Sequence, residues 1–463
     1  MSGPKKAAIQ NLGCSKNQID GERILALLAR SGYEITQDCA AADVIVVNTC
    51  AFIKEAQEEA IETILEMAAL RKTGKCQTLI VSGCFSERYR EQVKTEFPEV
   101  DVWAGVEDWG EILTSLLKNE VEDEHDEKVS PSLLTNGDND SRPQSYPKSI
   151  DKIIADDSYS FKRILSEPLS TQYIKIAEGC SHKCSFCVIP SIRGNFRSRS
   201  VDSILQEAGW LYEQGTRELI LVAQDTSFYG RDINTNLVGL LESLLKNTDF
   251  PWIRMMYLHP QLVDDDLLTL IASEKRLCRY FDIPLQHIAD PILAAMNRKP
   301  LSKGIYKLIE NIRNTVDNVT LRSSFIAGFP GETEKEFQEL VKFVEQTRFD
   351  KLGVFPFSPE DGTPVNDMRP RPRAATVQKR CEELMAVQQE ISREILCNKI
   401  GTKTEIIIDR TSDDHDFNYE GRTKGDAPEV DGRVFIQSGS FEIGRILTGR
   451  IVGSSDYDLY VDI

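Results

Sequence analysis

Two groups of three cysteines are the residues of this sequence best suited to chemistry. The compact trio, Cys180, Cys184 and Cys187, has the spacing Cys-x3-Cys-x2-Cys, and Phe186 stands directly before its last cysteine. Three thiolates can bind three irons of a four-iron cluster, which leaves the fourth iron open to a substrate or cofactor. The compact trio therefore predicts a [4Fe-4S] cluster with one open iron.

A zinc site is the alternative for the compact trio, with His182 as the fourth ligand. Zinc sites built from closely spaced cysteines usually close with a second ligand pair further along the chain, and the sequence has no such pair. The compact trio also follows the first strand of a predicted barrel, which is where barrel enzymes carry their chemistry. We therefore favour the iron–sulfur cluster.

A second group, the dispersed trio, consists of Cys14, Cys50 and Cys84. Each follows an apolar, strand-like run, at residues 6–12, 43–49 and 78–83. Helical segments at 20–30 and 54–70 separate these runs, and this alternation predicts a parallel, doubly wound sheet. Ligand sites in such sheets lie beyond the carboxyl ends of the strands, so we expect the three thiols to converge. Each cysteine alone would more simply be a buried side chain at a strand end.

The total of eleven cysteines in a long chain argues for metal or redox use rather than for disulfides. The cysteines outside the two trios show no ligand-like spacing, and we expect them to be small buried hydrophobic side chains: Cys39, Cys76, Cys278, Cys381 and Cys397.

The middle of the chain repeats a strand-and-helix pattern. Six strands are predicted, at residues 172–177, 218–223, 252–258, 280–285, 320–327 and 352–357. Helical segments such as 201–213 and 334–346 separate them. Six parallel units predict an open (β/α)6 barrel with its chemistry at the carboxyl ends of the strands, and the compact trio follows the first of these strands.

Composition divides the chain into four parts. An N-terminal α/β domain is predicted over residues 1–118, and an acidic, flexible linker over 119–165. The barrel is predicted over 166–398, and one long helix is predicted over 374–400. Residues 399–463 are rich in glycine and short β runs (404–408, 434–437, 445–452 and 458–461), which indicates a small β-barrel or sandwich.

One loop and two side chains are further candidates for binding. The loop from Gly328 to Thr333 follows the fifth barrel strand, and Gly328 and Gly331 would let a nucleotide approach the backbone; a tight turn with Glu332 capping the next helix explains the loop equally well. Arg322 would meet a carboxylate of a cofactor or substrate, or form an internal ion pair. His287 is a pocket residue or a packed polar side chain.

A local arginine cluster, Arg193, Arg197 and Arg199, is expected to be a solvated or ion-paired loop rather than a binding patch.

The charge of the chain favours a basic partner. The net charge is −18, with 73 acidic and 55 basic residues, and residues 401–463 carry thirteen Asp or Glu against seven Lys or Arg. Such a tail repels phosphate and attracts a Lys/Arg-rich protein. No apolar run is long enough to span a membrane and no signal-peptide segment opens the chain, so we expect a cytoplasmic protein without a membrane partner.

The compact trio resembles the signature of the radical S-adenosylmethionine (SAM) enzymes. Flanking motifs are similar to those of the methylthiotransferases within that superfamily: 12–17 around Cys14, 48–53 around Cys50, 82–84, 188–194, 284–287, 326–333 and the β-rich tail, which is a TRAM domain in that family. The resemblance covers the chain except for residues 119–160.

This resemblance implies two [4Fe-4S] clusters. Cys180, Cys184 and Cys187 would hold the cluster that cleaves SAM to a 5′-deoxyadenosyl radical. Cys14, Cys50 and Cys84 would hold an auxiliary cluster whose free iron carries the sulfur to be methylated and transferred. It also implies that Phe186, Arg322, Gly328, Gly331 and Glu332 contact the cofactor, and that a protein such as flavodoxin or ferredoxin supplies electrons.

The family has two substrate classes, an aspartate of small-subunit ribosomal protein twelve and an adenosine near the tRNA anticodon. The run 223–230 resembles the protein-modifying branch, since the tRNA enzymes tend to carry asparagine where Asp225 stands. We therefore expect methylthiolation of the aspartate, with Asp225 and His287 on the substrate side and nucleic acid unlikely as substrate. A tRNA-adenosine methylthiotransferase is the alternative, and a non-catalytic, zinc-stabilised RNA- or ribosome-binding protein is a more remote one.

Overall fold

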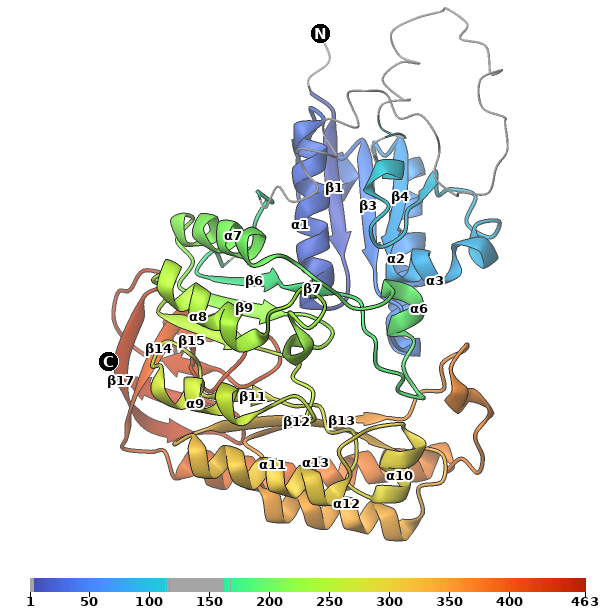
Figure 1. Cartoon of the computed structure of the whole chain (residues 1–463). Coiled ribbons are helices and arrows are strands. Elements are labelled where there is room, and N and C mark those ends of the chain that lie inside the picture. The colour runs from blue at the N-terminus through green and yellow to red at the C-terminus, as the bar shows by residue number, and fades with distance from the viewer. Residues whose placement is uncertain (1–3, 113, 115, 117–161, 167) are drawn as a thin grey trace, which may run out of the picture. The chain divides into compact units, whose positions relative to one another are not determined.

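The computed structural model describes residues 4–112, 114, 116, 162–166 and 168–463, which form two compact units divided between Ile164 and Leu165 (Figure 1). Most of the predicted acidic linker therefore lies outside the described residues. Each unit is described by itself. Across the described ranges, no helix combines the length and the apolar composition that a membrane crossing requires.

The first unit is a five-stranded parallel sheet with helices on both faces. Its strands lie in the order β2-β1-β3-β4-β5, and every neighbouring pair is parallel. Figure 1 shows α1 on one side of the sheet and α2 and α3 on the other. The elements are β1 (Lys6–Asn11), α1 (Ser15–Arg30), β2 (Glu34–Ile35), η1 (Cys39–Ala41), β3 (Val44–Thr49), α2 (Lys54–Thr73), β4 (Thr78–Gly83), α3 (Cys84–Val93) and β5 (Val102–Trp103). The prediction of a doubly wound parallel sheet is confirmed.

The central strands of this sheet show why the apolar runs predicted it. Every residue of β3 and β4 is buried, because helices cover both faces of the sheet. Helix α1 begins at Ser15, five residues before the predicted start. Its first turn carries buried polar side chains, including Lys16 and Asn17, and these hid the helix from a search for apolar periodicity.

The barrel of the second unit consists of two three-stranded parallel sheets. They have the orders β10-β9-β6 and β11-β12-β13, and a parallel bridge between Ile253 and Leu277 links them. The strands are β6 (Thr171–Lys175), β9 (Glu218–Val222), β10 (Trp252–Met255), β11 (Tyr280–Asp282), β12 (Thr320–Ala327) and β13 (Lys351–Pro356). The six predicted strands are thus present, and β6 and β13 are the outer ones, as expected for an open barrel.

Helices cover the outside of the barrel and enclose one large apolar core. Figure 1 shows α11, α12 and α13 beside β12 and β13. The helices and short elements are β7 (Ala177–Glu178), α6 (Ile189–Arg193), β8 (Arg197–Ser198), α7 (Val201–Glu213), η2 (Thr226–Phe228), α8 (Leu237–Asn247), α9 (Asp265–Ser273), α10 (Asp290–Ala295), α11 (Ser302–Thr315), α12 (Glu334–Thr347), η3 (Pro364–Asp367) and α13 (Ala374–Cys397).

The tail is a closed five-stranded barrel in the order β14-β15-β16-β18-β17. Its strands are β14 (Lys403–Thr411), β15 (Tyr419–Thr423), β16 (Val434–Ile436), β17 (Ile446–Ser454) and β18 (Leu459–Asp462). The sequence predicted four of them and missed β15. That strand contains Glu420, Gly421 and Arg422, which look like loop residues, but both charged side chains are buried in ion pairs.

The tail barrel contacts the amino ends of the central strands through buried ion pairs. Arg422 of the tail lies 2.7 Å from Glu218, the first residue of β9, and 2.7 Å from Asp409. Arg254 of β10 lies 2.7 Å from the same Glu218. Both Glu218 and Arg254 are fully buried. These arginines hold the pKa of the Glu218 carboxyl below its ordinary value although burial alone would raise it.

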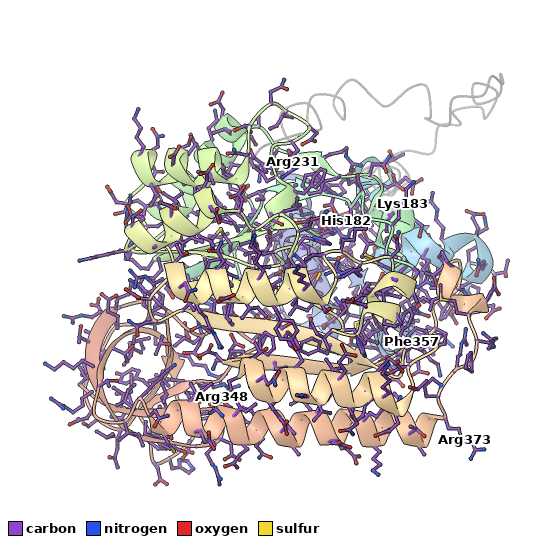
Figure 2. The ribbon with its side chains drawn as sticks, turned by 60° about the horizontal axis from the view of Figure 1, so that its bottom comes forward. His182, Lys183, Arg231, Arg348, Phe357 and Arg373 are labelled. Carbon is purple, nitrogen blue, oxygen red and sulfur yellow. The ribbon has the colours of Figure 1, made fainter. Side chains whose placement is uncertain are left out.

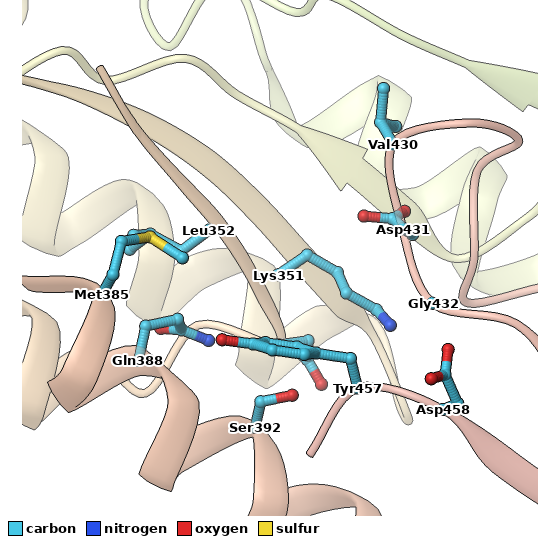
Figure 3. A pocket seen from close by; sticks show the side chains of 11 residues that line it. Lys351, Leu352, Met385, Gln388, Ser392, Val430, Asp431, Gly432, Tyr457 and Asp458 are labelled. Atoms are coloured by element: carbon cyan, nitrogen blue, oxygen red, sulfur yellow. The ribbon is translucent and has the colours of Figure 1, made fainter. Parts of the chain in front are cut away.

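A cavity of about 290 Å³ lies at this joint, between α13, the start of β13 and two tail loops (Figure 3). Figure 3 shows the Lys351 side chain extending from β13 toward Asp431 and Asp458 of the tail. The Lys351 ammonium lies 2.6 Å from Asp426. Burial would lower the pKa of Lys351, but Asp426 and Asp431 raise it above its ordinary value. The charges at the joint are therefore largely paired with one another.

Candidate functional site

The dispersed trio lies at the carboxyl edge of three adjacent strands of the first unit. Cys14 precedes α1 in the connection from β1, Cys50 directly follows β3, and Cys84 directly follows β4 as the first residue of α3. Because β1, β3 and β4 are neighbours in the sheet, residues 36 and 34 positions apart in sequence come to one edge. The convergence expected from the strand pattern is therefore present in the backbone.

Two glycines make these sharp turns possible. Gly13 has φ +91°, and a Cβ there would stand 2.7 Å from the Cβ of Cys50 and 3.1 Å from its Sγ. Gly83 has φ +90°, and a Cβ there would stand 2.6 Å from the carbonyl oxygen of Thr49. Positive φ and close approach both exclude a larger residue. The glycines therefore bring the Cys14 loop and the start of α3 close to the end of β3.

Asn17 ties the three cysteine-bearing segments together. Its Nδ2 donates to the carbonyl oxygens of Leu12 (2.9 Å) and Thr49 (2.8 Å), and its Oδ1 lies 3.9 Å from the Sγ of Cys84. Asn17 is almost fully buried. Asn17 stands in the motif around Cys14, but no role was predicted for it. An amide three residues after a candidate ligand was the available signal.

The compact trio lies on the loop between β7 and α6 in the barrel. Gly179 has φ +78°, and a Cβ there would clash with the backbone of Asn195, so only glycine fits before Cys180. The backbone N–H of Cys180 donates to the carbonyl oxygen of Gly194 (3.0 Å). Burial is the main cause that raises the pKa of Cys180 to about 11 and that of Cys187 to about 12. Cys184 contributes to both shifts, so the three thiols lie within electrostatic reach of one another.

Glu178 organises the start of this loop. Its carboxylate accepts from Lys175 (2.6 Å), Arg193 (2.9 Å) and Gln224 (2.9 Å), and it is buried together with both cations. Burial alone would raise the pKa of Glu178, but Lys175 and Arg193 hold it below its ordinary value. No role was predicted for Glu178 from the sequence. A carboxylate two residues before a candidate ligand was the available signal.

His182 and Asp225 form the polar contact between the cysteine loop and the second barrel strand. His182 Nε2 lies 2.6 Å from Asp225 Oδ2, and the His182 ring stacks on His259 at 4.2 Å. The other carboxylate oxygen of Asp225 accepts from Ser227 Oγ and from the N–H of Phe228. Asp225 is buried, and its carboxylate is held by these contacts within the chain.

The cysteine loop lies at the carboxyl side of the barrel. In Figure 2, His182, Lys183 and Phe357, which follows β13, lie toward one side, whereas Arg348, which precedes β13, lies toward the other. Phe186 of the loop packs edge-on against Phe329, with ring centroids 6.4 Å apart. Phe329 follows Gly328, so the cysteine loop contacts the glycine-containing loop that the sequence singled out.

The two glycines of that loop have different surroundings. A Cβ at Gly328 would stand 2.4 Å from the side chain of Val377 in α13, so this glycine is required for packing. A Cβ at Gly331 would meet nothing within 4 Å, so the backbone there borders open space. Packing thus explains Gly328, whereas the backbone at Gly331 is exposed and its N–H donates to the carbonyl oxygen of Pro370 (2.9 Å).

Glu332 and His287 belong to a buried polar network. Both oxygens of the Glu332 carboxylate accept from the N–H of Gly328 (3.0 Å each), and Arg380 of α13 donates to it at 2.7 Å. His287 Nε2 lies 3.3 Å from the same carboxylate, and both side chains are fully buried. Helix α12 is capped by Thr333 instead. These contacts agree with the second alternative for His287, a packed polar side chain.

Arg322 lies near the amino end of β12, away from the cysteine loop. Its Nη1 lies 2.7 Å from Asp282 and its Nε 3.6 Å from Asp431. Of the two alternatives for Arg322, the structure supports the internal ion pair. Its guanidinium is already paired with carboxylates of the chain. Of the local arginine cluster, Arg193 and Arg199 are also ion-paired, the latter with Glu207 at 2.5 Å.

Both trios have the donor set of an iron–sulfur site, because each gathers three thiols at the carboxyl edge of a parallel sheet. Within the described ranges, no three His, Cys, Asp or Glu side chains are close enough to hold one metal ion. In a four-iron cluster each cysteine binds a different iron.

Three family models match successive parts of the chain. They are Uncharacterized protein family UPF0004 over residues 6–105, Radical SAM superfamily over 174–344 and TRAM domain over 400–463. The first and third parts contain the strands of the parallel sheet and of the small closed barrel. The second runs from within β6 to within α12 and leaves out β13 of the open barrel. Among solved structures, the radical SAM methyltransferase TsrM from Kitasatospora setae is similar in fold, with a TM-score of 0.56, 16% identity, and 84% of this chain and 89% of that chain covered.

Relatives match the chain over its full length. The ribosomal protein uS12 methylthiotransferase RimO of Geotalea uraniireducens is 40% identical over 99% of this chain and 98% of the relative. RimO of Geobacter sulfurreducens is 40% identical with both chains fully covered, and RimO of Clostridioides difficile is 39% identical over 99% and 98%. The chain therefore belongs to the RimO family of radical SAM methylthiotransferases.

Proposed function

We propose that this protein transfers a methylthio group to the β-carbon of an aspartate on ribosomal protein uS12. The observation that carries this function is the pair of cysteine trios, each at the carboxyl edge of a parallel sheet and each with three thiols. The full-length identity to proteins named uS12 methylthiotransferases supports the choice of substrate.

In this function, Cys180, Cys184 and Cys187 hold one [4Fe-4S] cluster, and Cys14, Cys50 and Cys84 hold the other. When bound, these clusters and SAM supply the hydrogen-abstracting radical, the methyl group and the sulfur. The raised pKa of Cys180 and Cys187 means that cluster binding displaces protons from these thiols. Glu178 positions the loop before Cys180, and Asn17 positions the segments around Cys84.

The SAM site lies beside the cysteine loop in this proposal, where Phe186 provides an aromatic wall and Gly331 an exposed backbone. Gly328 and Glu332 shape this loop from within and do not contact the cofactor directly. The proposed domain limits are 1–118 for the auxiliary-cluster domain, 166–398 for the barrel and 399–463 for the TRAM domain.

A basic protein substrate suits the negative charge of the chain, although some acidic residues of the tail form ion pairs within the chain. Asp409, Asp426 and Asp431 pair with cations at the joint. Exposed acidic residues remain on the tail, among them Asp413 and Asp414. These favour a Lys/Arg-rich ribosomal protein over tRNA. The reaction takes place in the cytoplasm, with a small electron carrier such as flavodoxin or ferredoxin as reductant.

Mass spectrometry distinguishes this function from the tRNA alternative. Cells lacking the protein should contain uS12 without the mass of a methylthio group, while their tRNA keeps its methylthioadenosine. The reverse result would assign the protein to tRNA. As a biochemical test, the reconstituted enzyme should modify purified uS12 and leave anticodon stem-loop RNA unchanged.

Two cysteine variants test the division of roles. Cys180→Ala should abolish reductive cleavage of SAM. Cys50→Ala should retain part of this cleavage but transfer no methylthio group. Cys278→Ala is the matched control, because that cysteine is fully buried in the barrel and belongs to neither trio. Normal transfer by the Cys50 variant would disprove the role of the dispersed trio.

A further inference from the structure

One turn of the barrel holds the middle of the cysteine loop. It begins at the last residue of α10 and comprises residues 295–298. The carbonyl oxygens of Ala295 and Met296 accept from the Oγ (2.8 Å) and the N–H (3.0 Å) of Ser185, respectively. Asn297 Nδ2 donates to the carbonyl oxygen of Lys183 at 2.7 Å. The residues on both sides of Cys184 are therefore fixed by the same turn.

The last residue of the turn contacts the cysteine itself. Arg298 Nη1 lies 3.8 Å from the Sγ of Cys184, a distance that suits an N–H donor and the large sulfur atom. Arg298 Nη2 donates to the carbonyl oxygen of Pro284, which lies beyond the end of β11. The guanidinium is thus held between a backbone carbonyl and a thiol, with its planar donors directed at both.

The conformation of the turn brings Arg298 to this place. Asn297 has φ +54°, a left-handed conformation that asparagine tolerates better than most residues. This residue ends α10 and reverses the chain, so that Arg298 points back to the cysteine loop. Strained non-glycine residues of this kind are often found at functional sites.

Arg298 differs from the other buried cations near the loop. Arg193 and Lys175 are paired with Glu178. Within the described parts of the chain, Arg298 forms no ion pair with a carboxylate. Its guanidinium instead contacts Cys184 of the compact trio.

We propose that Arg298 is a positioning residue that donates a hydrogen bond to the Cys184 thiolate and raises the reduction potential of the cluster held by the compact trio. This inference rests on the proposed function. Reduction adds one electron to a site that already carries negative thiolates. A cation and an N–H donor at the sulfur stabilise the reduced state more than the oxidised state, and hydrogen bonds to cluster sulfurs are a known means of setting such potentials.

The test uses the reconstituted protein with Cys14, Cys50 and Cys84 replaced by Ala, so that only the cluster of the compact trio is observed. The one-electron potential is measured without SAM by redox titration monitored by electron paramagnetic resonance. In Arg298→Gln we expect the ratio of reduced to oxidised cluster at a fixed potential to fall at least about tenfold, which corresponds to a shift of about 59 mV. Arg298→Lys should show a smaller decrease.

The matched control is Arg276→Gln. The Arg276 guanidinium donates to the carbonyl oxygens of Thr248 and Leu245 in the same barrel, and not to a cysteine of the described chain. Its potential should equal that of the parent protein. An unchanged potential in Arg298→Gln with full iron content would overturn the inference. A parent protein that binds no four-iron cluster would overturn the proposed function instead.

A second measurement uses the parent protein, so it does not depend on whether a variant folds. Protein labelled with 15N-arginine should show a weak 15N hyperfine coupling in the reduced cluster, because a guanidinium nitrogen is hydrogen-bonded to a ligand sulfur. The coupling should persist in Arg276→Gln. Its absence in the parent protein would overturn the inference, whatever the behaviour of the Arg298 variants.

Discussion

The two ends of the central barrel both contain a buried carboxylate between two cations, but they differ in what surrounds it. At the carboxyl end, Glu178 lies between Lys175 and Arg193 and leads directly into Cys180. At the amino end, Glu218 lies between Arg254 and Arg422 and joins the barrel to the tail.

The difference shows that buried charge by itself does not mark an active site. At the amino end, the charges neutralise one another within a joint, and their partners come from two packed modules. At the carboxyl end, the same kind of pairing holds a loop whose three thiols lie within electrostatic reach of one another. The carboxyl end is distinguished by the candidate sulfur ligands that follow the buried carboxylate and its cations. The buried charges alone do not distinguish it.

The largest expected effect is on stability at the amino end. Glu218→Gln leaves Arg254 and Arg422 without a buried counter-charge, and we expect the free energy of unfolding to fall by about 3–5 kcal/mol. Urea denaturation of the cluster-free protein measures this. Glu405→Gln, which removes a partly exposed pair with Lys424, should cost about 1 kcal/mol or less. Equal losses in the two variants would contradict the role of the joint.

At the carboxyl end, the same substitution should act on function. Glu178→Gln loosens the loop before Cys180, and we expect about a 100-fold loss in the rate of SAM cleavage, as for other residues that support metal ligands. The measurement is made at equal iron content. If Glu178→Gln behaved like Glu218→Gln, with lower stability but normal cleavage, the contrast between the two ends would be wrong.

A smaller effect is expected at the contact between the cysteine loop and the second strand. Asp225→Asn removes the charge next to His182, and we expect about a tenfold loss of methylthio transfer. Asp232→Asn is the control, because that carboxylate accepts from the exposed N–H of Ser198, and it should keep normal transfer. A loss of tRNA discrimination without a loss of rate would instead place Asp225 in substrate choice.

The smallest effect concerns the start of helix α12, which follows the loop of Gly328 and Gly331. Thr333 caps α12 through a capping box with Glu336. Thr333→Ala should lower the free energy of unfolding by about 1 kcal/mol and leave the rate of transfer unchanged. Thermal denaturation and the transfer assay together test this, and a fall in rate at unchanged stability would assign Thr333 to the site.

Apolar periodicity predicted most of the fold because the strands are buried on both faces. The strand runs around residues 43–49 and 78–83 were predicted within a residue of β3 and β4 for this reason. The method failed where polar residues are buried. It placed the start of α1 late because Lys16 and Asn17 are buried there, and it missed β15 because Glu420 and Arg422 are satisfied by partners distant in sequence.

The sequence by itself determined the chemistry of this protein, because the types and spacing of six cysteines specify an iron–sulfur donor set and their order along the chain specifies the family. The tertiary structure decided which neighbours act on those cysteines. It paired Arg322 with Asp282, closed Glu332 onto Gly328 and brought Arg298 to Cys184 from 114 positions away. Such contacts depend on how strands and turns pack in three dimensions, and local sequence carries no record of them.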